Sequence, residues 1–178
     1  MDQWVILLRG INVGGHGKLP MADLRALLLA MGLQDVQTYI QSGNVVVRGP
    51  QPDAGRIMDK VEVNFGFRRD VQVFSAAAFE AVALACPFSP VEGKHLHIWF
   101  TGRVERLDLV ETIALAADDE ALHIGPEAVY LHAPSGIGRS KLAEKLPRYL
   151  PTRATARNWS TVQKLRAMLI EGAAGASG

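Results

Sequence analysis

The sequence has little of what would mark a secreted, disulfide-stabilised or membrane protein. Its 178 residues include one cysteine, which excludes an internal disulfide and indicates a reducing compartment. No apolar run is long enough to span a membrane, and the opening stretch MDQWVILLRG lacks the pattern of a secretory signal. We therefore expect a soluble, cytoplasmic protein without a membrane partner.

An excess of charge of one sign is also missing. Lys plus Arg number 19 and Asp plus Glu 18, for a net charge of +1. This balance excludes a general attraction to nucleic acid or to anionic membranes. Basic side chains do gather between Arg139 and Arg166, where Glu144 is the one acidic residue. Any anion binding must therefore come from local clusters.

The known nucleotide-binding motifs are absent, although RGINVGGHGK places four glycines before a lysine. Aligned on Lys18, a P-loop would need glycine at Asn12 and a hydroxyl residue at Leu19. The dinucleotide pattern fails too, because Pro20 stands where its third glycine belongs. We predict that residues 10–18 do not wrap a triphosphate as a P-loop does. The G-x-S-x-G stretch of serine hydrolases is missing as well.

What the sequence does contain is one order of elements, repeated. Apolar spacing in the first half predicts strands and helices in the order 3–8 (strand), 20–31 (helix), 35–40 and 45–48 (strands), 56–65 (helix), 69–74 (strand) and 76–85 (helix). In the second half the same reading gives 95–100 (strand), 107–117 (helix), 121–124 and 128–132 (strands), 140–146 (helix), 152–157 (strand) and 161–171 (helix).

This repeat predicts an α+β fold of two ferredoxin-like βαββαβ subdomains, each followed by an extra helix. We expect the subdomains at 1–86 and 95–171, joined through CPFSPVEG, and a flexible tail at 172–178.

The expected topology brings two pairs of loops together. With strand order 4-1-3-2, the first two strands end at one edge of the sheet and the last two at the opposite edge. In the first half this places RGINVGGHGK beside QSGN, and in the second half APSGIGRSK beside TARNWST.

The second pair of loops has the richer chemistry. Glycines permit close backbone approach, cations attract an anion, and tryptophan offers a stacking face. We predict that one concavity is lined by Arg139, Lys141, Arg157 and Trp159. The further candidate ligand-binding residues are Gly136, Gly138, Ser140 and Asn158. The alternative is purely structural, with both loops acting as capped helix starts and Trp159 packed in the core.

The first pair offers amides and one lysine. The candidate ligand-binding residues here are Asn12, Lys18, Gln41 and Asn44. The alternative is that the glycines only allow a tight reversal of the chain and that the lysine is solvated.

Metal and thiol chemistry have little support. His95 and His97 fall on one face of a predicted strand, with His132 on a neighbour, but no cysteine or close carboxylate completes a site. Cys86 precedes a proline and has no neighbouring base, so a structural thiol is favoured over a nucleophile. We expect no metal and no cofactor.

Several stretches closely resemble a bacterial family, domain of unknown function 1697. They are LLRGINVGG, LPMADLRALLLAMGLQDVQTYIQSGNVVV, VYLHAPSGIGRSKL and TARNWSTVQKL. The resemblance extends over nearly the whole chain and implies a cytosolic α+β protein of two similar subdomains, with no established activity. The family's R-N-W-N-T stretch has asparagine where this chain has Ser160.

Three functions remain open. The leading hypothesis is a binding module for a phosphate-bearing small molecule or a nucleic-acid segment. The second is a transferase-type enzyme on an anionic substrate, in which Lys141 and Arg157 stabilise charge and His132 or Glu144 is a remote candidate base. The third is a structural or protein-interaction protein. The sequence does not indicate an oligomeric state.

Overall fold

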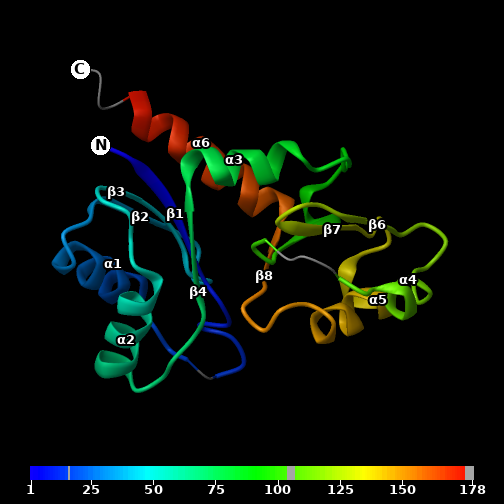
Figure 1. The fold of residues 1–178 in the computed structure, drawn as a ribbon, viewed down its shortest axis with the longest axis horizontal. Helices are drawn as coiled ribbons and strands as arrows, with labels where there is room; N and C mark the ends of the chain where they lie inside the picture. Colours follow the sequence, from blue (N-terminus) through cyan, green and yellow to red (C-terminus); the bar gives the residue numbers. More distant parts are fainter. Residues whose placement is uncertain (16, 104–106, 175–178) are drawn as a thin grey trace. The chain divides into compact units, whose positions relative to one another are not determined.

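The computed structural model describes residues 1–15, 17–103 and 107–174. Contacts divide the chain into two units, Met1–Glu80 with Gln163–Gly178, and Ala81–Val162. Each unit contains one four-stranded antiparallel sheet (Figure 1). The chain leaves the first unit inside helix α3 (Ala76–Leu84) and returns inside helix α6 (Trp159–Ala174).

Helix α6 therefore belongs mostly to the first unit, whereas the order of elements in the sequence grouped 161–171 with the second half. The helix also extends into the expected tail, because α6 continues to Ala174, and the rest of that tail, 175–178, lies outside the described residues.

The first unit has the βαββαβ order. Its elements are β1 (Gln3–Leu8), α1 (Met21–Ala30), β2 (Gln34–Tyr39), β3 (Asn44–Arg48), α2 (Ala54–Phe65) and β4 (Val71–Ser75). The strands lie in the order β2-β3-β1-β4, which is the predicted order 4-1-3-2 read in reverse. Local chemistry fixes α2 at both ends. The Asp53 carboxylate accepts the Arg56 N–H at 3.0 Å, and Gly66 ends the helix with a φ of 76°.

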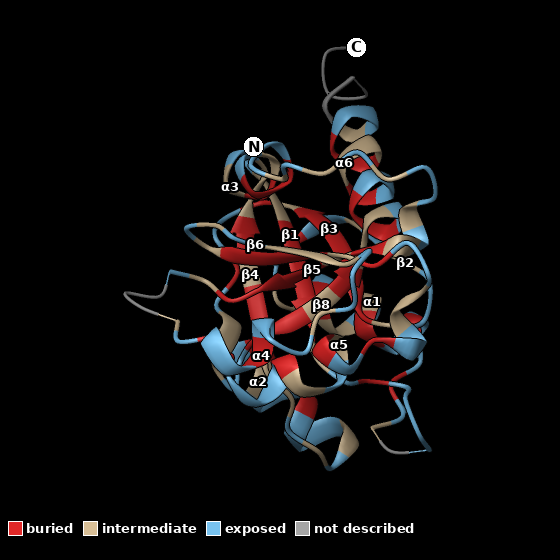
Figure 2. Cartoon of the chain, turned by 90° about the vertical axis from the view of Figure 1, so that its right-hand side faces the viewer, coloured by how far each residue is buried: buried red, intermediate tan, exposed pale blue. Residues whose placement is uncertain are grey.

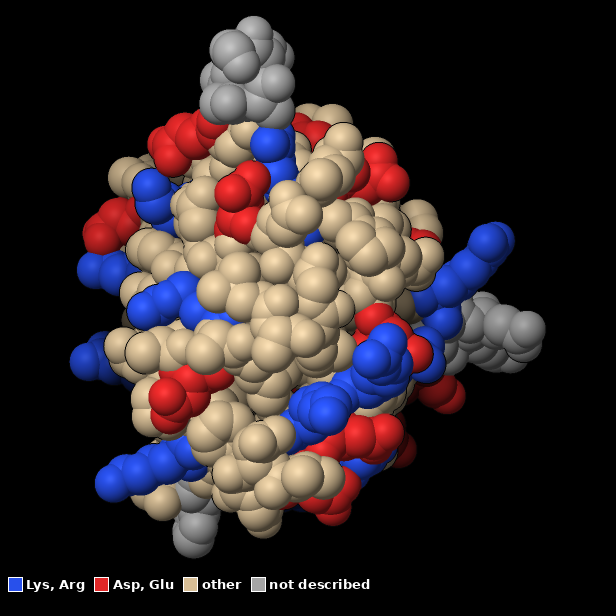
Figure 3. All heavy atoms as spheres, turned by 90° about the vertical axis from the view of Figure 1, so that its left-hand side faces the viewer, with Lys and Arg blue, Asp and Glu red and all other residues tan. Residues whose placement is uncertain are grey.

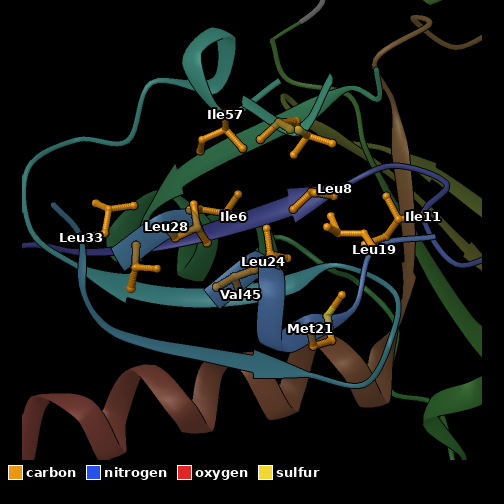
Figure 4. Close-up of a cluster of buried hydrophobic side chains, with 13 residues drawn as sticks. Ile6, Leu8, Ile11, Leu19, Met21, Leu24, Leu28, Leu33, Val45 and Ile57 are labelled. Carbon is orange, nitrogen blue, oxygen red and sulfur yellow. The ribbon is translucent and has the colours of Figure 1, made fainter. Parts of the chain in front are cut away.

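The core of the first unit lies between the sheet and the helices α1 and α2 (Figure 4). Ile6 and Leu8 alternate along β1 toward these helices, and Val45 and Val47 of β3 lie on the same face. The helices contribute Leu24, Leu28, Ile57 and Val61. The period-two pattern of the strands and the helical spacing thus meet in one core.

The other face of this sheet meets α6. The Gln3 side chain of β1 donates from Nε2 to the Leu169 carbonyl of α6 at 3.0 Å. Arg166 of α6 also donates from Nε to Glu80 of α3 at 2.7 Å, and this bond lowers the pKa of the Glu80 carboxyl. These contacts explain why the last helix joins the first unit.

The second unit repeats the order. Its elements are the 3₁₀ turn η1 (Gly93–His95), β5 (Leu96–Phe100), α4 (Val110–Ile113), β6 (Ala121–Ile124), β7 (Ala128–His132), η2 (Ile137–Arg139), α5 (Lys141–Lys145), η3 (Leu146–Arg148) and β8 (Thr155–Asn158). The strands lie in the order β6-β7-β5-β8, again as predicted. Buried positions follow strands such as β1 and β5, drawn red in Figure 2.

Helix α4 is much shorter than the helix predicted over 107–117. It covers four residues, and its N-cap Leu109 makes no side-chain capping bond. Val110 and Ile113 point to solvent, with exposed fractions of 75% and 46%. So little apolar burial supports one turn rather than three. Across the described residues, no helix is both long and apolar enough to cross a membrane.

Candidate functional site

The glycine-rich loop after β1 lies against the β2–β3 turn, as the strand order predicts. Asn12 connects the two, because its Nδ2 donates to the Gln41 carbonyl at 2.7 Å and to the Leu19 carbonyl at 2.9 Å. Its Oδ1 accepts the Leu19 N–H at 2.8 Å. Leu19, which stands where a P-loop would have a hydroxyl residue, is fully buried and therefore belongs to the core.

The predicted ligand-binding amides of this pair are used inside the loops. Asn44 is completely buried, and its Nδ2 donates to the Tyr39 carbonyl at 3.1 Å and to Ser42 Oγ at 2.9 Å. The Asn12 amide is similarly occupied. Gln41 and Lys18 are exposed, and the Lys18 ammonium has no partner among the described residues. Asn12 is also exposed, but its amide is used in three hydrogen bonds, so among the described contacts Gln41 and Lys18 are the candidates whose side chains stay available to a ligand.

A third loop, between α2 and β4, joins the same edge of the sheet. The Arg9 N–H donates to the Asp70 carbonyl at 2.9 Å, and Arg69 Nε approaches the Gly10 carbonyl at 3.4 Å. Sequence reasoning missed this loop. The strand order could have found it, because β4 begins at the edge where β1 ends. We call residues 9–15, 17–19, 40–43 and 66–70 the first-unit loop edge.

A hollow of about 420 Å³ opens at the first-unit loop edge. It is lined by Arg9, Gly10, Arg68, Arg69 and Asp70. Two of its arginines face carboxylates: Arg9 Nη1 is 3.4 Å from Asp70 Oδ2, and Arg68 Nη1 is 2.6 Å from Asp59 Oδ1. Hydrogen bonds to the carboxylates of Asp59 and Glu62 raise the pKa of Arg68, and the bond to Asp59 has the larger effect.

Arg69 differs from the other two arginines. Its Nη1 donates to the Arg68 carbonyl at 2.9 Å, and its Cζ lies 5.6 Å from the centre of the Phe67 ring. Within the described part of the chain, no carboxylate pairs with it and its Nη2 group has no partner. Backbone carbonyls and an aromatic ring thus orient a guanidinium whose charge is not neutralised.

In the second unit, side chains in the loop after β7 and at the end of β8 cap helices. Ser140 Oγ accepts the Ala143 N–H at 2.9 Å at the start of α5, as predicted. Asn158 Oδ1 accepts the Thr161 N–H at 2.9 Å at the start of α6. Asn158 therefore caps the last helix.

Arg157 lies apart from the other cations predicted beside it. It pairs with Ile98 across the sheet, while its neighbours Ala156 and Asn158 share the face that packs against α4 and α5. Its Nη1 donates to Thr155 Oγ1 at 2.8 Å, and burial lowers the pKa of Arg157 to about 10. Even so the guanidinium is charged at neutral pH, and it is enclosed rather than facing a ligand.

The expected concavity is thus divided. Arg139 and Lys141 are exposed, and the described residues supply no partner for either side chain. They flank the start of α5, on the side of the sheet opposite to Arg157. Gly138 is exposed beside them, Gly136 has a φ of 98°, and Trp159 is half-buried. Ligand binding by Arg139, Lys141 and Trp159 stays a prediction, without Arg157.

The histidines do not converge. His97 pairs with Leu131, so the next residue of β7, His132, is on the opposite face, where it stacks on Phe88 at 5.7 Å. Among the residues that the structure describes, no group of three or more metal-ligating side chains forms. Burial raises the pKa of the half-buried Cys86 thiol, which disfavours the reactive thiolate.

Comparison with known proteins adds a family and a fold. No curated protein matches the chain. Among solved structures, the chain is similar to that of the conserved bacterial protein SP0830 from Streptococcus pneumoniae, with 28% sequence identity and a TM-score of 0.70. The similarity covers 94% of this chain and 98% of that one, and it fits the arrangement of two units. Residues 1–130 match the sequence model of the family "Protein of unknown function (DUF1697)". The chain therefore belongs to the DUF1697 family of proteins of unknown function.

Proposed function

We propose that this protein binds a phosphate-bearing small molecule at the first-unit loop edge. The observation that carries the proposal is Arg69, an oriented guanidinium without a carboxylate partner among the described residues, in the wall of a hollow. Guanidinium groups bind phosphate through parallel N–H donors, and a preformed orientation reduces the entropy lost on binding.

The part of the glycine-rich loop that follows Gly10 in the sequence also supports the proposal. A Cβ added at Gly14 or Gly15 would meet nothing within 4 Å, so the backbone of both residues is open to a ligand. Both residues have a positive φ, 63° and 77°, which glycine adopts without steric cost. Lys18, exposed in the same loop, adds a second charge for a phosphate.

Size and charge favour a small molecule over a nucleic acid. A hollow of about 420 Å³ is within the usual range for small ligands. A nucleic-acid surface needs a continuous basic stripe, but two of the three arginines of the hollow, Arg9 and Arg68, already face the carboxylates of Asp70 and Asp59. The carboxylate in the lining of the hollow, Asp70, faces Arg9, so the proposal concerns binding rather than turnover.

Calorimetry with inorganic phosphate, pyrophosphate, nucleotides and sugar phosphates would test the proposal. Arg69→Ala should weaken binding roughly tenfold or more, because a hydrogen bond to a charged group contributes about 1.5–3 kcal/mol. Arg69→Lys should recover only part of the affinity, since lysine keeps the charge but not the planar fork.

Lys141→Ala is the matched control, because Lys141 is an exposed cation at the predicted loops of the second unit. Loss of binding in Lys141→Ala with full binding in Arg69→Ala would reject the first-unit site in favour of the second. If an oligonucleotide binds much more tightly than any mononucleotide, the ligand class is wrong.

A further inference from the structure

Helices α1 and α2 leave an open groove on their outer side, away from the sheet. Its volume is about 460 Å³. Its floor is apolar: Leu27 and Met31 at α1 and Phe65 of α2 are partly buried side chains that pack on the core below. The groove lies within the first unit and has no residue in common with the hollow at the loop edge.

The walls of the groove are low and partly apolar. On the α1 side the exposed side chains of Ala26 and Ala30 stand one turn apart, so another surface can approach the helix closely. Beside the groove, outside its lining, Val63 of α2 stands one turn from Lys60 and is 82% exposed. A large apolar side chain with so much exposure gains from any surface that covers it.

The two walls have opposite unpaired charges. Asp23 of α1 and Lys60 of α2 both line the groove and are exposed. Neither has a side-chain partner in the described part of the chain, and they do not pair with each other. By contrast, the neighbouring Asp59 on α2 is already bound to Arg68.

We infer that this groove is the contact between two copies of the chain, related by a twofold axis. Such an axis, running along the groove in the plane of the contact, exchanges its two walls, so Asp23 of each copy meets Lys60 of the other. The same operation covers the apolar floor and Val63 on both copies. A surface with an apolar floor, an unpaired negative charge on one wall and an unpaired positive charge on the other is complementary to itself.

The face on the α1 and α2 side fits this reading. Uncharged surface fills its middle, and blue and red side chains surround it (Figure 3). Helices of 10 and 12 residues present faces only about 15–18 Å long, at a rise of about 1.5 Å per residue. The contact is therefore small, and we expect a reversible dimer whose population rises with protein concentration.

Sedimentation equilibrium of the full chain over a wide range of concentration tests the inference. Wild type should pass from one chain mass to two. Asp23→Lys or Lys60→Glu alone places like charges together at both symmetric contacts, and each should raise the dimer dissociation constant roughly tenfold or more. The double variant Asp23→Lys, Lys60→Glu restores opposite charges and should recover the dimer.

Lys164→Glu is the matched control, because Lys164 is an exposed lysine of α6 outside the groove and the net charge changes equally. It should leave the dissociation constant unchanged. A wild-type mass of one chain at every concentration overturns the inference, and so does a double variant as weak as either single one. A melting curve of each variant shows whether it is folded.

Discussion

Replacing Gly43 with alanine should destabilise the protein much more than the same change at Gly14. Both glycines have a positive φ, 73° and 63°. At Gly14 an added Cβ would meet nothing within 4 Å, whereas at Gly43 it would lie 2.7 Å from Leu8 Cβ and 2.8 Å from Ile11 Cδ1. Both neighbours are buried with an exposed fraction of 1%. The two variants thus share the backbone strain and differ in the clash.

The size of the difference follows from these contacts. Alanine at a positive φ costs about 1–2 kcal/mol, and this cost applies to both variants. Carbon atoms pack best at about 3.5–4.0 Å, so the Cβ at Gly43 is too close by about 1 Å. Leu8 Cβ is attached directly to the backbone of β1 and cannot rotate away. Overpacking of this kind costs about 1–3 kcal/mol, which is the expected excess for Gly43→Ala.

Urea unfolding followed by far-ultraviolet circular dichroism measures the difference. Wild type, Gly14→Ala and Gly43→Ala should lose stability in increasing order. Equal free energies of unfolding for the two variants, within about 0.5 kcal/mol, would show that the turn after β2 moves freely relative to β1 and would refute the reasoning.

Three further changes follow from local geometry. The buried Tyr130 hydroxyl donates to the Val82 carbonyl at 2.7 Å, and burial raises the pKa of Tyr130 from 10.0 to about 12. Its stabilising contribution is complete below pH 10 and falls as pH rises to 12, so the advantage of wild type over Tyr130→Phe should shrink by up to about 3 kcal/mol in this window. Parallel stability curves would contradict this. Ile40 is 51% exposed with a φ of 50°, so Ile40→Asn should raise the free energy of unfolding by about 1 kcal/mol. A lower melting temperature would count against strain there. Asn12→Ala removes three hydrogen bonds that hold two loops together, so the free energy of unfolding in urea should fall by about 2 kcal/mol. An unchanged unfolding midpoint would mean that other contacts hold the loops.

The sheets were predictable because the apolar pattern within each short segment indicates where a strand begins and ends. The strands β1, β6 and β7 have the bounds that the apolar patterns predict, and the repeated βαββαβ order fixed the neighbours of each strand. The strand order also brought the first two loops together, as the bond from Asn12 to Gln41 shows.

Features that depend on tertiary contact were harder to predict. The direction of Arg157 follows from which face of β8 the helices cover, and the sequence of a four-residue strand does not state this. The length of α4 was overestimated because Val110 and Ile113 look like a core stripe but are exposed. The role of Arg69 was missed because only loops after strands were considered, and this residue precedes β4.

The division of the chain has a consequence for synthesis. The second unit, Ala81–Val162, is continuous, whereas the first unit is completed by residues from Gln163 onward. During translation, the face of the first sheet that carries the Gln3 side chain therefore stays uncovered until the entire second unit has emerged and α6 follows it. A nascent chain stalled before Gln163 would expose this face at a time when all strands of both sheets already exist. Chaperone binding and aggregation during translation should be greatest in that interval, and they should end when the last helix is made.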